Sequence, residues 1–149
     1  MSNYLFVAGN TGPVEILLQH FESAHGANGN ELSSTLISDK KMLFVIERRN
    51  DSVKSSIVKS SNDDGLFFRG QALDHDSSSM ILGVEGFAKF QKKYPSYSNP
   101  QRIADLEGTF VLARWNQDVL TFQNDLYSIY RMLYFASEDV LIVSDSLVV

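Results

Sequence analysis

Cysteine is absent from the 149-residue chain, which excludes disulfide bonds, thiolate metal sites and a cysteine nucleophile. Basic residues are few: 13 Lys and Arg against 18 Asp and Glu give a net charge of −5. Because nucleic acids and anionic membranes are bound through basic surfaces, this balance argues against both as partners. No apolar run approaches the roughly 18–20 residues of a membrane-spanning helix, and the N-terminus lacks a signal-peptide pattern. We therefore expect a cytoplasmic protein with one domain, residues 1–149.

The strongest pattern that is present lies in the last third of the chain. Four short apolar runs, at residues 106–115, 118–122, 132–135 and 140–144, are separated by Asn, Asp, Ser or Gly. Runs of this length, rich in Val, Phe, Tyr and Ile, are typical of β-strands joined by tight turns. The C-terminal third therefore predicts a meander of three or four strands.

The rest of the chain predicts further strands and two helices. Strands are expected at residues 3–8, 42–46, 56–58 and 66–73. Helices are expected at residues 14–22 and 80–93, where apolar side chains recur every three or four positions, and the polar loop 74–79 is expected to cap the second helix. Gly83 and Gly86 weaken that helix by about 1 kcal/mol each, which close packing against a sheet would offset. These elements predict an α+β fold of two mostly antiparallel sheets flanked by helices.

Short motifs in the C-terminal third occur in a recognisable order. They are residues 105–110 (DLEGTF), Asn124-Asp125, Leu133-Tyr134 and Ser144-Asp145. This order resembles the class II glutamine amidotransferase domain at the N-terminus of asparagine synthetase-like enzymes. It is also similar to the corresponding domains of β-lactam synthetase and carbapenam synthetase, which keep the architecture without the glutaminase chemistry. The resemblance implies an αββα sandwich of the N-terminal-nucleophile (Ntn) hydrolase kind.

The resemblance also assigns the positions of a glutaminase site. Ser2 stands where the family has its nucleophilic cysteine, and Arg48 where an arginine binds the glutamine carboxylate. Arg69 and Gly70 stand where an Asn-Gly pair forms the oxyanion hole, and Ser77 where an aspartate holds the substrate. An N-terminal nucleophile uses its own α-amine as the base, and each oxyanion donor contributes about 3 kcal/mol. Serine is a weaker nucleophile than cysteine, Arg69 replaces a compact amide, and Ser77 lacks a carboxylate. We therefore expect no catalytic residue, and a vestigial pocket at the other four positions.

The expected function is that of a non-catalytic glutaminase-like domain in an ATP-dependent amide-forming enzyme, in specialised metabolism such as antibiotic biosynthesis. Such a domain would pack against a synthetase domain, in cis or in trans. The synthetase's Ser-Gly-Gly-x-Asp-Ser motif is absent from the sequence, so we expect a fragment or a shortened relative. Two alternatives stay open: an amidohydrolase that uses Ser2, and an independent binding module.

Cofactors and metals are not expected, because the three histidines lack metal-ligand spacing and the acidic pairs lack the arrangement of a calcium loop. A homo-oligomer stays open. Most aromatic residues are candidates for the core. Tyr127, Tyr130 and Arg131 interrupt the strand pattern, and they belong either to ordinary surface or to an exposed aromatic-basic patch of the kind found at partner surfaces.

Overall fold

The computed structural model describes residues 4–9, 16, 19–20, 23, 30–38, 41–48, 57–61, 64–116, 119–127, 129 and 131–145. The chain divides into two compact units. The first unit consists of Met1–Ser52 and Arg131–Val149, and the second consists of Val53–Tyr130. Each unit contains one antiparallel sheet, and the described residues include few helices, which places the chain in the α+β class.

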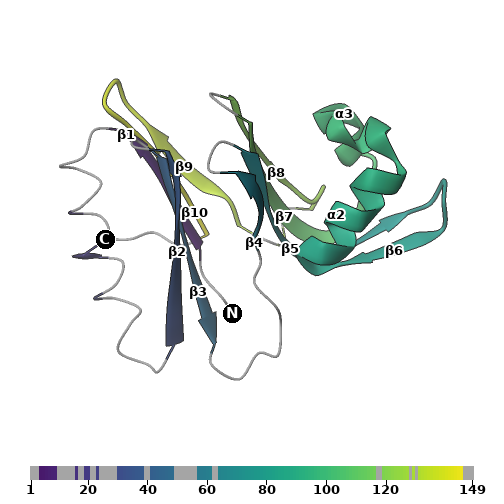
Figure 1. Ribbon diagram of the computed structural model, residues 1–149, viewed down its shortest axis with the longest axis horizontal. Coiled ribbons are helices and arrows are strands. Elements are labelled where there is room, and N and C mark those ends of the chain that lie inside the picture. Colours follow the sequence, from purple (N-terminus) through teal and green to yellow (C-terminus); the bar gives the residue numbers. More distant parts are fainter. Residues whose placement is uncertain are drawn as a thin grey trace. The chain divides into compact units, whose positions relative to one another are not determined.

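The sheet of the first unit has the strand order β2-β3-β1-β10-β9 (Figure 1). Its strands are β1 (Tyr4–Gly9), β2 (Asn30–Ser38), β3 (Lys41–Arg48), β9 (Leu133–Ala136) and β10 (Val140–Ser144). The N-terminal strand β1 is central, because β3 and β10 pair with it on either side. Residues 4–7 are all buried, consistent with an apolar run that does not alternate with polar residues.

The sheet of the second unit has the order β4-β5-β7-β8, with β6 paired to β5. Its strands are β4 (Ile57–Ser61), β5 (Asp64–Asp74), β6 (Ser79–Leu82), β7 (Glu107–Asn116) and β8 (Val119–Asn124). Its helices are α2 (Gly83–Lys93), the short 3-10 helix η2 (Pro95–Ser98) and α3 (Pro100–Ile103). None of the helices in the described part of the chain has the length and apolar character needed to cross a membrane.

The core of the second unit lies between α2 and the sheet. Val84, Phe87 and Phe90 are buried and recur every three residues, so they lie along one face of α2. The ring of Phe68 in β5 stacks on Phe87, with 4.7 Å between centroids, and on Phe110 of β7, with 5.7 Å. Helix α2 therefore joins the two longest strands of the unit through stacked aromatic rings.

The four strands expected in the C-terminal third are confirmed as β7, β8, β9 and β10. The expected meander was wrong, because the four strands do not form one sheet: β7 and β8 belong to the second unit, whereas β9 and β10 join β1 in the first. Strand β2 has no counterpart among the expected strands, because its Ser- and Thr-rich sequence lacks an apolar run. The expected helix at residues 14–22 lies largely outside the described residues.

The expected helix at residues 80–93 was wrong at its start. Residues 79–82 form β6, and the polar loop before it is the turn between β5 and β6 rather than a helix cap. Helix α2 begins at Gly83, whose φ of +61° suits glycine at the change from strand to helix. The expected close packing at the two helix glycines was also wrong. No described atom lies within 4 Å of a Cβ added to Gly83, and the nearest to one on Gly86 is 3.8 Å away.

Candidate functional site

The residues assigned to the glutaminase site fall into both units. Ser2 lies outside the described residues, and Arg48 is the last residue of β3, with its Cα opposite Asn30. Both belong to the first unit. Arg69 and Gly70 are neighbours within β5, and Ser77 lies in the turn that follows this strand, all three in the second unit. The expected pocket of Arg48, Arg69, Gly70 and Ser77 stays a prediction.

Gly70 lies where two strand backbones approach closely. Its φ is +109°, and an added Cβ would lie 2.1 Å from the carbonyl oxygen of Thr109 and 2.9 Å from the Cα of Phe110. No other residue type fits here without moving β5 away from β7. The pairing of β5 with β7 therefore requires this glycine whether or not the position serves an oxyanion hole. Arg69, beside it, is half-buried.

Ser77 closes a hydrogen-bonded turn around Asp74. The Ser77 backbone N–H donates to Asp74 Oδ2 at 3.1 Å, and the Ser77 hydroxyl donates to the same oxygen. The other carboxylate oxygen, Oδ1, accepts a 2.5 Å hydrogen bond from the hydroxyl of Tyr97 in η2. Both oxygens of this buried carboxylate thus have donors from its own unit. We call Asp74, Ser77 and Tyr97 the Asp74 cluster.

The protonation states in the Asp74 cluster are fixed at neutral pH. Burial alone would raise the pKa of Asp74, but the hydrogen bonds from Ser77 and Tyr97 stabilise the carboxylate and lower this pKa below its usual value. Burial, together with donation to the Asp74 carboxylate, raises the pKa of Tyr97 to about 12. The cluster at neutral pH is therefore an ionised carboxylate that accepts a hydrogen bond from a neutral phenol.

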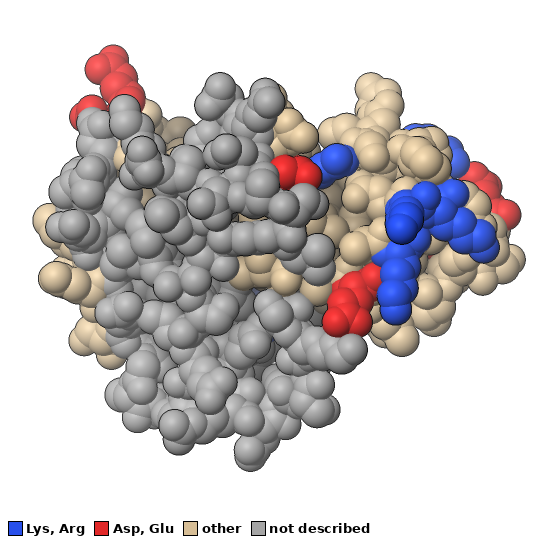
Figure 2. Space-filling model, viewed as in Figure 1, with Lys and Arg blue, Asp and Glu red and all other residues tan. Residues whose placement is uncertain are grey.

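Charged side chains surround this cluster on the surface. Arg102 Nη2 lies 3.0 Å from Asp76 Oδ2, and Arg102 Nη1 lies 2.9 Å from Asp105 Oδ2. The guanidinium also lies over the Tyr97 ring, 5.1 Å from its centroid. Figure 2 shows basic side chains gathered near α2 with acidic side chains beside them. This surface is therefore mixed in charge, and exposed pairs of this kind contribute little to stability.

The Ser144-Asp145 motif binds the start of the N-terminal strand. The Ser144 hydroxyl donates to the Tyr4 carbonyl oxygen at 2.9 Å, and Asp145 Oδ1 accepts from the Tyr4 backbone N–H at 3.2 Å. The Tyr4 hydroxyl donates to the carbonyl oxygen of Arg131 at 2.9 Å. Burial, with the nearby Asp145 charge, raises the Tyr4 pKa and keeps this phenol protonated. Tyr4 thus binds both Arg131, which precedes β9, and the Ser144-Asp145 motif at the end of β10.

Asp125, the acidic member of the Asn124-Asp125 motif, terminates β8. Its backbone N–H donates to the Phe110 carbonyl oxygen at 3.0 Å. Its side-chain Oδ1 accepts from the backbone N–H groups of Tyr127 and Ile129, at 3.0 and 3.2 Å. The carboxylate therefore organises the backbone that leaves the second sheet. In the first unit, Ser144 and Asp145 bind the backbone of Tyr4 at the start of β1. Both motifs therefore form hydrogen bonds with backbone groups.

The described residues offer no metal site, and the comparisons with known proteins identify no further functional residue. Within the described parts of the chain, no three His, Asp or Glu side chains lie close enough together to hold a metal ion. His75 Nε2 lies 2.9 Å from Glu107 Oε2, but both side chains are exposed. In comparisons with known proteins, no protein-family model, no curated protein and no solved structure matches the chain.

Proposed function

We propose that this chain is a non-catalytic, glutaminase-like domain of an ATP-dependent amide-forming enzyme of the asparagine synthetase kind, with the αββα sandwich of Ntn hydrolases. The α+β class and the two antiparallel sheets are compatible with that architecture. The position of β1 at the centre of its sheet supports it further, since Ser2 is two positions before the first residue of this strand in the sequence. The domain would be cytoplasmic and would pack against a synthetase domain in cis or in trans.

The observation that carries the non-catalytic assignment is the use of Ser77. A glutaminase of this family needs a carboxylate at this position to pair with the ammonium group of the substrate. Here the Ser77 hydroxyl is a donor to Asp74, and the Asp74 carboxylate accepts a second donor from Tyr97. The serine and its neighbouring carboxylate therefore stabilise the turn, and binding of a substrate ammonium by Asp74 would require breaking these hydrogen bonds.

A glutaminase assay tests the absence of activity. The protein is first analysed by mass spectrometry to establish whether Met1 has been removed, because a retained methionine blocks the α-amine of Ser2. Glutamate release from glutamine is then measured for the wild type and for Ser2→Ala. We expect both to equal the buffer background. Hydrolysis that is present in the wild type and lost in Ser2→Ala would overturn this assignment and establish the alternative, an amidohydrolase.

Binding to a synthetase tests the packing role. The natural choice is an asparagine synthetase-type domain encoded beside this chain or within the same polypeptide. Co-elution of the two in gel filtration, at a defined stoichiometry, is the expected result. A synthetase domain that elutes separately, and whose activity is unchanged by an excess of this chain, would contradict the packing role.

A further inference from the structure

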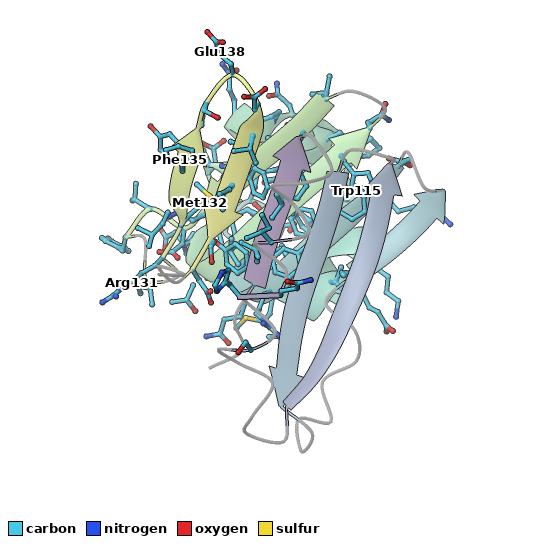
Figure 3. All side chains as sticks on the ribbon, turned by 90° about the vertical axis from the view of Figure 1, so that its left-hand side faces the viewer. Trp115, Arg131, Met132, Phe135 and Glu138 are labelled. Atoms are coloured by element: carbon cyan, nitrogen blue, oxygen red, sulfur yellow. The ribbon has the colours of Figure 1, made fainter. Side chains whose placement is uncertain are left out.

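We draw no further inference here: the strongest candidate, the exposed apolar edge that β9 forms in the first unit's sheet, with Phe135 between Arg131 and Glu138 (Figure 3), carries nothing, because no contact in the described part of the chain shows what covers it.

Discussion

Replacing Gly65 by alanine should destabilise the protein, although alanine is usually the better residue outside special turns. Gly65 lies opposite Trp115 in the β5–β7 pair, and the indole covers it. An added Cβ would lie 2.1 Å from Trp115 Cζ2 and 2.5 Å from Cε2, far inside the 3.4 Å at which ordinary contact begins. Trp115 is fully buried, so the ring cannot move aside into solvent.

The magnitude follows from two opposing effects. Forcing an extra methyl group into a packed core costs about 1–3 kcal/mol. The loss of conformational freedom in the unfolded chain returns about 0.5–1 kcal/mol. The overlap is with the middle of a rigid ring, so we expect a cost at the high end and a net loss of about 2 kcal/mol. For a chain of this size that lowers Tm by about 4–8 °C.

Urea unfolding followed by fluorescence is a direct assay, since Trp115 is the single tryptophan and reports on its own packing. Gly86→Ala is the matched control. A Cβ there meets nothing closer than 3.8 Å, and alanine favours a helix over glycine by about 1 kcal/mol, so this variant should be more stable than the wild type. Both substitutions add one methyl group, and they should change the free energy of unfolding in opposite directions.

A double-mutant cycle separates the steric clash from other causes. Trp115→Phe removes the ring atoms that the new Cβ would meet, at the cost of a cavity. In that background, Gly65→Ala should cost at least about 1 kcal/mol less, as measured by circular dichroism. A Gly65→Ala variant as stable as Gly86→Ala, or a cost that Trp115→Phe does not reduce, would refute the reasoning.

Three further predictions concern the hydrogen bonds of buried groups. Tyr97→Phe removes a 2.5 Å donor from the buried Asp74 carboxylate and should lower the free energy of unfolding by about 2 kcal/mol in urea titrations; no change would show that water replaces the phenol. Because the folded-state pKa of Asp74 is lowered, its contribution is complete above its unfolded pKa and is lost as the pH falls through the folded pKa. The stability difference between wild type and Asp74→Asn should therefore narrow from about pH 5 to about pH 2, and a constant difference would contradict the lowered pKa. Ser144→Ala removes the 2.9 Å hydrogen bond to Tyr4 and should cost about 1 kcal/mol, with faster hydrogen exchange in β1; equal exchange rates would show that this bond does not hold the strand.

The sequence predicts an element correctly where the spacing of its apolar residues suits only one kind of secondary structure. It fails where the spacing suits both a helix and a strand. Strands β7 to β10 have apolar runs bounded by turn residues, which leave no other assignment. The apolar residues among 80–82 continue the helical spacing of α2, and they suit a strand equally well. Their pairing with β5 decides for the strand, and a tertiary contact of this kind outweighs local preference. The distribution of β7–β10 over two sheets also depends on pairing with β1, at the other end of the chain.

The site was predictable only where its contacts are local. The spacing of Asp74 and Ser77 is that of a turn in which an aspartate accepts from the residue three positions later, so this contact was within reach of the sequence. The third member of the cluster, Tyr97, comes from a different element. The contact of Ser144 with Tyr4 spans 140 positions, and no local pattern indicates it. Ser144-Asp145 is recognisable as a motif in the sequence, but its partner Tyr4 is identified only by the pairing of β1 with β10 in the sheet.

The central position of β1 has a consequence for the order of folding. The second unit is continuous in sequence, from Val53 to Tyr130, so all of its strands are available once Tyr130 has been synthesised. The first unit cannot complete its sheet until β10 emerges from the ribosome, since β10 is one of the two neighbours of β1. Contacts of such long sequence separation form slowly, and the apolar residues 4–7 stay without a complete sheet during most of synthesis. Premature termination before β10 therefore exposes an aggregation-prone strand at the opposite end of the chain.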